Sequence, residues 1–145
     1  MKKYSLVILA ALVVVAGSLR YLSSLARVTA NVSGRELPIY SVETEEEKVA
    51  LSFDAAWGNE DTQKILDILQ KEKVHVTFFM TGGWVESYPD DVKAIYEAGH
   101  DLGNHSDNHK NMSKLSVDEC KSDLQQVHDR VNELTGYEMF LFRPP

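Results

Sequence analysis

The residues of this chain best suited to chemistry begin with two histidines. His105 and His109 are four positions apart, and on one turn of a helix such a pair faces the same side. Two imidazoles placed in this way can hold one borderline-soft metal ion such as zinc. Gly103, just before the pair, would let the backbone turn sharply, and the residues between the histidines are all polar. The pattern therefore indicates a metal site and is not typical of the apolar face of a core helix.

An aspartate and an arginine follow two apolar runs elsewhere in the chain. Asp54 follows the run 49–53, and Arg143 follows Phe140–Phe142. A carboxylate at the end of a buried strand is costly unless it is paired, and Arg143 is the candidate to pair with Asp54 and fix its orientation. Pro144 and Pro145 would stiffen the backbone that holds the arginine. The alternative is that Asp54 only caps the next helix or turn.

Strand patterns and helix patterns alternate along the part of the chain that carries these residues. Short apolar or β-branched runs predict strands at 49–53, 74–80, 101–103 and 139–142. Three helices are expected between them: one begun by Asn59 or Asp61 with apolar positions at 65, 66, 68 and 69, one over Asp90–Ala98 between Pro89 and Gly99, and one over Ser116–Leu134 that ends at Gly136.

This alternation predicts an α/β fold with right-handed crossovers and a parallel sheet. Asp54, the histidine pair and Arg143 each follow a predicted strand. In β/α barrels the chemistry gathers at the carboxyl ends of the strands, so these residues should converge there.

The composition is that of an ordinary globular domain with an acidic balance. Of the 145 residues, 43% are hydrophobic and 26% are charged, and the formal net charge is −7. Nucleic-acid binding needs a clustered cationic face. We therefore expect no nucleic-acid partner.

The N-terminus has the layout of an export signal. Lys2 and Lys3 precede an apolar run, Leu6–Gly17, which is shorter than the ~20 residues that usually span a membrane. We interpret residues 1–25 as a signal peptide or an uncleaved membrane anchor, and either predicts an exported, extracellular or envelope-bound protein. Residues 26–47 are expected to be a linker, with a short strand possible near 37–42, and residues 48–145 to form the domain.

Four ordered segments of the domain together resemble the polysaccharide deacetylases with NodB homology, a carbohydrate esterase family. They are Ser52–Asp54 with Gly58, Thr77–Phe79, Gly99–His109 and Phe142–Pro145. Within this family the chain looks closest to the sporulation-type enzymes, whose first motif can carry the same Trp-Gly pair after the aspartate.

This resemblance implies the N-terminal part of a distorted (β/α) barrel and metal-dependent removal of acetyl groups from an N-acetylated glycan. By position, Asp54 would be the general base, His105 and His109 two ligands of a divalent metal, expected to be zinc, and Arg143 the residue that orients the base. Such an ion acidifies its water and polarises the carbonyl in amide hydrolysis. Trp57 would either line the sugar-binding cleft or pack over the barrel mouth.

The chain departs from the family pattern in two ways. The usual second aspartate of the first motif, the third metal ligand, is replaced by Ala55. The later motifs are also absent, so the resemblance implies a truncated and inactive domain. Two hypotheses stay open: a cell-envelope deacetylase, and a catalytically silent relative that binds glycans in wall or spore assembly.

Overall fold

The computed structural model describes residues 31–32, 35–36 and 38–145. The contacts divide the chain into two parts between Glu47 and Lys48. In the first part, β1 (Asn31–Val32) pairs antiparallel with β2 (Arg35–Glu36), and residues 38–42 form no strand. The predicted signal or anchor, residues 1–25, lies outside the described residues. Within those residues, no helix is both long and apolar enough to cross a membrane.

The second part contains a parallel sheet whose strands are β3 (Ser52–Ala55), β4 (Thr77–Met80) and β5 (Asp101–Asn104), in that order. The ladders align Phe53 with Phe78 and Leu102, and the next positions along each strand, Asp54, Phe79 and Gly103, also align. Because side chains alternate between the faces of a sheet, these two rows face opposite ways. The parallel α/β architecture predicted from the sequence is confirmed.

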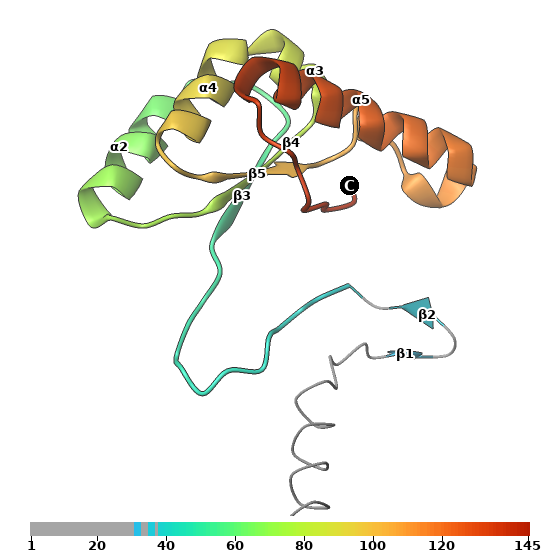
Figure 1. Ribbon diagram of the computed structural model, residues 1–145, viewed down its shortest axis with the longest axis horizontal. Helices are drawn as coiled ribbons and strands as arrows, with labels where there is room; N and C mark the ends of the chain where they lie inside the picture. The colour runs from blue at the N-terminus through green and yellow to red at the C-terminus, as the bar shows by residue number, and fades with distance from the viewer. Residues whose placement is uncertain (1–30, 33–34, 37) are drawn as a thin grey trace, which may run out of the picture. The chain divides into compact units, whose positions relative to one another are not determined.

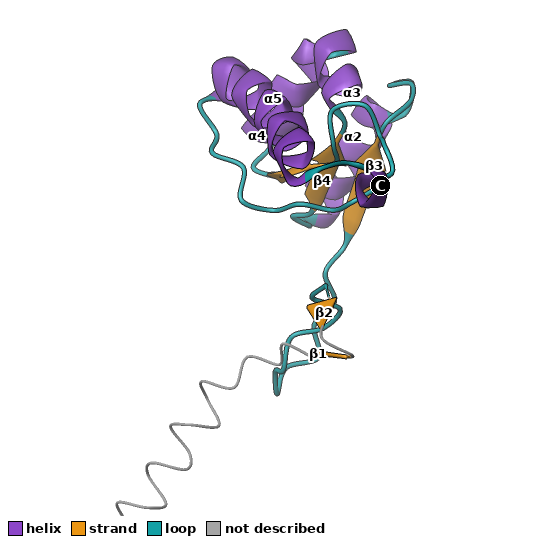
Figure 2. Cartoon of the chain, turned by 90° about the vertical axis from the view of Figure 1, so that its right-hand side faces the viewer, coloured by secondary structure: helices purple, strands orange, loops and turns teal. Residues whose placement is uncertain are grey.

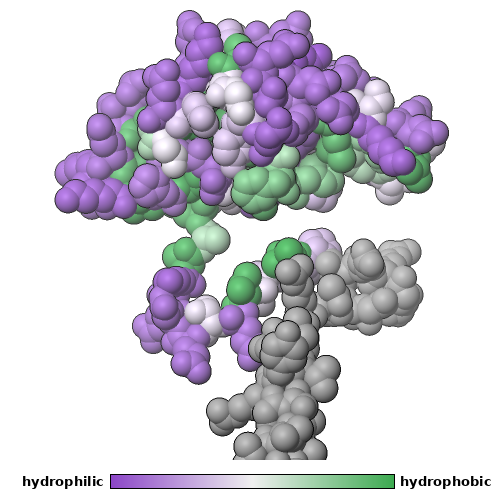
Figure 3. All heavy atoms as spheres, in the orientation of Figure 1, coloured by the Kyte–Doolittle hydropathy of each residue, from purple (hydrophilic) through white to green (hydrophobic). Residues whose placement is uncertain are grey.

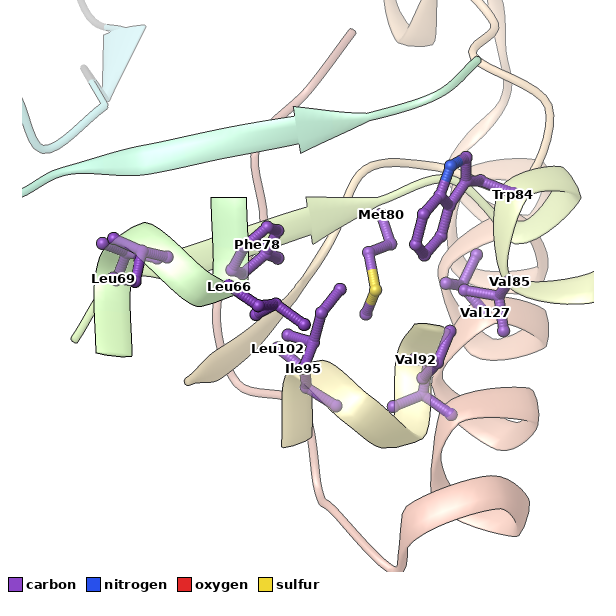
Figure 4. Close-up of a cluster of buried hydrophobic side chains, with 12 residues drawn as sticks. Leu66, Leu69, Phe78, Met80, Trp84, Val85, Val92, Ile95, Leu102 and Val127 are labelled. Atoms are coloured by element: carbon purple, nitrogen blue, oxygen red, sulfur yellow. The ribbon is translucent and has the colours of Figure 1, made fainter. Parts of the chain in front are cut away.

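Helices cover one face of this sheet (Figures 1 and 2). They are α2 (Thr62–Glu72), α3 (Gly82–Ser87), α4 (Pro89–Glu97) and α5 (Val117–Thr135), with a 3₁₀ turn, η1 (Met112–Lys114), before α5. The row that contains Phe78 and Leu102 points into the core under them (Figure 4). Met80, Ile95 and Val127 from β4, α4 and α5 are fully buried there. The row of Asp54 is left on the face away from the helices.

The ends of α4 and α5 follow the predicted signals, whereas Asp61, directly before α2, makes no side-chain capping hydrogen bond. Ser116 and Glu119 form a capping box at the start of α5, and Gly136 ends that helix with a φ of 73°. Pro89 is the first residue of α4, where a missing N–H has no effect. Hydrophilic side chains cover the outside of the helical layer, as Figure 3 shows.

Two local predictions were wrong, and one short helix was not foreseen. The first strand begins at Ser52 rather than Val49, which is 97% exposed, so Asp54 lies inside β3 and not after it. The helix α3 was not predicted, because its six residues are too few to show a helical period. The predicted strand 139–142 contributes a single bridge, between Asn104 and Phe142.

Candidate active site at the carboxyl edge of the sheet

The four predicted site residues meet at the carboxyl edge of the sheet. Asp54 lies near the end of β3, and His105 directly follows β5. The segment after α5 runs parallel to the end of β5: the backbone N–H of Asn104 donates to Leu141 O at 2.9 Å, and that of Arg143 donates to Asn104 O at 3.0 Å. Arg143 is thereby brought between residues that are 38 and 89 positions away in sequence.

Arg143 pairs with the carboxylate of Asp54 and fixes its orientation. Its Nη1 donates to Asp54 Oδ1 at 2.6 Å, and its Nη2 donates to Ser52 Oγ at 2.6 Å. The guanidinium also lies 4.3 Å from the centre of the Phe79 ring. The side chains of Asp54 and Arg143 are 43% and 39% exposed, so this pair orients the carboxylate more than it stabilises the fold.

Gly103 makes room for this stack. A Cβ at Gly103 would overlap the Phe79 ring, so the ring lies directly across the glycine backbone and under the arginine. Gly103 is buried within β5 and is not among the glycines with positive φ. The prediction that it makes a sharp turn was wrong, and its role is to allow the close approach of Phe79.

The buried imidazole of His105 is oriented by the same arginine. Its Nδ1 lies 2.8 Å from the carbonyl oxygen of Arg143, which can only accept, so Nδ1 carries the proton. In the neutral imidazole, Nε2 then keeps its lone pair. A backbone carbonyl on the other ring nitrogen is the usual arrangement around a metal-ligating histidine.

His109 is exposed and reaches the same place by a loop, not by a helix. Residues 105–109 are not helical, and Ser106 and His109 have φ angles of 71° and 51°. The ring centres of His105 and His109 are 4.9 Å apart, and that of Trp57 is 5.3 Å from His109. The expectation of one helical turn was wrong, although the two imidazoles do lie together.

A partly buried ionic network, for which the sequence gives no signal, holds this loop. Asp107, between the two histidines, pairs with Arg130 of α5, and its backbone N–H donates to Asp123 Oδ2 at 2.9 Å. A Cβ at Gly82 would overlap Asp107 and Arg130, so this ion pair needs a glycine at the start of α3. Nothing in the spacing of residues 82, 107, 123 and 130 signals that they meet.

The residues present fit two metal ligands and not a complete set of three. No group of three or more His, Cys, Asp or Glu residues in the described part of the chain could hold a metal ion. Ala55, at the position of the expected third ligand, packs against the hydrophobic core. Catalytic zinc is usually held by three protein ligands, so that arrangement does not fit this site.

The fold and site define an α/β protein with a carboxylate, an arginine and two histidines at the carboxyl edge of a parallel sheet. The model of the family described as polysaccharide deacetylase matches residues 41–145. The chain belongs to this family.

Two curated relatives show how much of such proteins the chain represents. It is 40% identical over 98 residues to a peptidoglycan-N-acetylglucosamine deacetylase of Bacillus cereus, with 68% of this chain and 36% of the relative covered. It is 36% identical over 107 residues to the peptidoglycan-N-acetylmuramic acid deacetylase PdaA of Bacillus subtilis, with 73% and 41% covered. The chain thus spans about two fifths of the relatives' length.

Among solved structures, the chain is similar to a protein described as a CE4 family pseudoenzyme from Bacillus anthracis. The identity is 39%, the TM-score is 0.67, and 70% of this chain and 36% of that chain are covered. A mutant of this pseudoenzyme is described as having restored enzymatic activity.

Proposed function

We propose that this protein hydrolyses N-acetyl groups on a cell-envelope polysaccharide that is peptidoglycan-like or chitin-like. The observation that carries the proposal is the position of Arg143, which binds Asp54 through its guanidinium and His105 through its carbonyl oxygen. One residue therefore couples a candidate base to a candidate metal ligand. Relatives named as peptidoglycan deacetylases support the substrate class.

The proposed roles follow from what each side chain offers. Asp54 is exposed and can accept a proton from an attacking water, while Arg143 fixes the direction of its oxygens. His105 and His109 supply nitrogen ligands for a divalent ion, with zinc as the expected metal. When bound, such an ion would polarise the amide carbonyl of the acetyl group.

The proposed place of action is the cell envelope outside the membrane. The basic and apolar pattern of residues 1–25 supports export, with the segment either removed or kept as a membrane anchor. The acetylated glycan is the proposed partner.

A second candidate function is glycan binding without catalysis in wall or spore assembly. Ala55 favours it, because a methyl group cannot bind a metal ion and the described residues offer no group of three ligands. The similarity to a family pseudoenzyme also supports this candidate.

Substitution of Ala55 separates the two candidates. We expect Ala55→Asp to raise zinc affinity by at least about tenfold, because it adds a carboxylate ligand next to Asp54. The variant should also unfold at a lower denaturant concentration, since Ala55 packs against the core. Zinc titration, urea unfolding and acetate release from an N-acetylated chitin oligomer would be measured together, with Ala56→Asp as the matched control.

The outcomes are distinguishable. Acetate release by the unmodified chain with zinc, abolished in His105→Ala, supports the deacetylase. Release only by Ala55→Asp supports the silent relative, and equal zinc affinity of the two aspartate variants would contradict the role assigned to position 55.

A further inference from the structure

Trp57 is a large apolar side chain that lies next to the candidate active site and is not packed into the core. It lies in the loop between β3 and α2, and it is 82% exposed. The chain's other tryptophan, Trp84, is 3% exposed.

The loop that carries Trp57 is held in place from two helices. The indole Nε1 of Trp84 in α3 donates to the carbonyl oxygen of Gly58 at 2.6 Å. The side-chain amide of Asn59 donates to Asp91 in α4 at 2.8 Å. The two residues that directly follow Trp57 are thus anchored to the helical layer.

The indole also lies at the site and not merely near it. Its ring centre is 5.3 Å from that of His109, with the planes tilted by 54°. A hollow of about 150 Å³ is lined by Asp54, Ala55 and Trp57, among others. Trp57 therefore lies beside a candidate metal ligand and lines a hollow together with the candidate base, Asp54.

We propose that Trp57 is a sugar-stacking residue that binds the apolar face of a pyranose ring of an N-acetylated glycan. Aromatic side chains combine a large apolar surface with a π-face, so they suit a ligand that has C–H groups on one side and hydroxyls at its rim. The inference rests on the proposed function, since it assigns the same glycan to the same edge of the sheet. It holds for a deacetylase and for a silent glycan-binding relative alike.

The two tryptophans allow a direct test by fluorescence in the full chain. The probe is the tetramer of N-acetylglucosamine, which is titrated into the protein once in the presence of zinc and once in the presence of a chelator. The comparison separates a change in emission caused by metal binding at His109 from one caused by stacking of the sugar on Trp57. We expect the oligomer to change the emission of the unmodified chain and to leave that of Trp57→Phe, in which Trp84 is the remaining tryptophan, unchanged. By calorimetry, Trp57→Ala should bind about tenfold more weakly, and Trp57→Tyr close to normally.

Phe140→Ala is the matched control, because Phe140 is 74% exposed and its ring lies beside Tyr137 and not beside the histidines. Its affinity should equal that of the unmodified chain, and the urea midpoints of all variants should agree. Equal oligomer affinity in Trp57→Ala and the unmodified chain would overturn the inference and leave the proposed function untouched. Failure of the unmodified chain to bind the oligomer would also overturn the inference. Binding that depends on Trp57 without acetate release supports the inference and contradicts the proposed hydrolysis.

Discussion

Arg143 is the residue on which the geometry of the candidate site depends most. Its Nη1 and Nη2 donate to Asp54 and Ser52, and its guanidinium lies over the ring of Phe79. Its carbonyl oxygen orients the ring of His105. The first three contacts need a planar, forked cation, which lysine does not provide. The fourth is made by the backbone and is independent of the side chain.

Arg143→Lys should therefore separate the function of the guanidinium from stability. We expect acetate release to fall by at least about tenfold, because lysine cannot bind Asp54 and Ser52 together as the forked guanidinium does, so the carboxylate is no longer held in one orientation. The free energy of unfolding should change by less than about 1 kcal/mol, since the ion pair is largely solvent-exposed. Assays of acetate release and urea unfolding check both, with the exposed Lys121→Met as control; a proportionate loss of stability and activity would contradict the orienting role.

At the scale of elements, the loop of residues 105–109 depends on α3 and α5. Gly82 and Gly83 of α3 donate backbone hydrogen bonds to Ser106 O and Asp107 O at 3.1 and 3.2 Å. Arg130 of α5 pairs with the Asp107 carboxylate. A loop with two residues of positive φ is thus fixed by two helices that come before and after it in sequence.

Removal of the Arg130 charge should leave a buried carboxylate without its cation. We expect Arg130→Met to lower the free energy of unfolding by about 1–3 kcal/mol, because Asp107 is almost completely buried. The double variant Arg130→Met with Asp107→Asn should recover part of this loss, since no charge is then unpaired. Urea unfolding measures the cycle; a loss no larger than that of Lys121→Met on the same helix would show that the pair does not stabilise the loop.

At the scale of the whole molecule, the buried side chain of His100 makes the free energy of unfolding depend on pH. It is 5% exposed, next to Phe78 and His75, and its Nδ1 has no hydrogen-bond partner among the described residues. Burial lowers the pKa of His100 below its ordinary value of 6.5, and the nearby His75 lowers it further. The folded state therefore binds this proton less readily than the unfolded chain.

This pKa shift predicts acid destabilisation that begins near neutrality. As the pH falls below 6.5, the unfolded chain gains a proton at His100 that the folded chain resists, so the free energy of unfolding decreases. His100→Leu should reduce this dependence, whereas Lys121→Met, at an exposed position of α5, should retain it. Urea unfolding between about pH 5 and pH 8 tests this, and equal slopes for the native and His100→Leu chains would contradict it.

Several features could be predicted from the sequence because they depend on local chemistry. Ser116, Pro89 and Gly136 set helix ends through their own hydrogen bonds or dihedral angles. The alternation of strands and helices predicts a parallel sheet, and polar residues after apolar runs then meet at its carboxyl edge. The pairing of Arg143 with Asp54 follows from this rule, although 89 positions separate them.

Other features were decided only by tertiary contacts. The orientation of the His105 ring depends on a carbonyl oxygen 38 positions away in sequence. Asp107 pairs with Arg130 at a place where only a glycine, Gly82 of α3, leaves enough room. The place of Trp57 beside His109 is a tertiary contact between two loops, and Trp84 and Asp91 bind the residues that follow Trp57. The sequence by itself determined which groups stand at the edge of the sheet, whereas packing between distant segments decided how each is aimed.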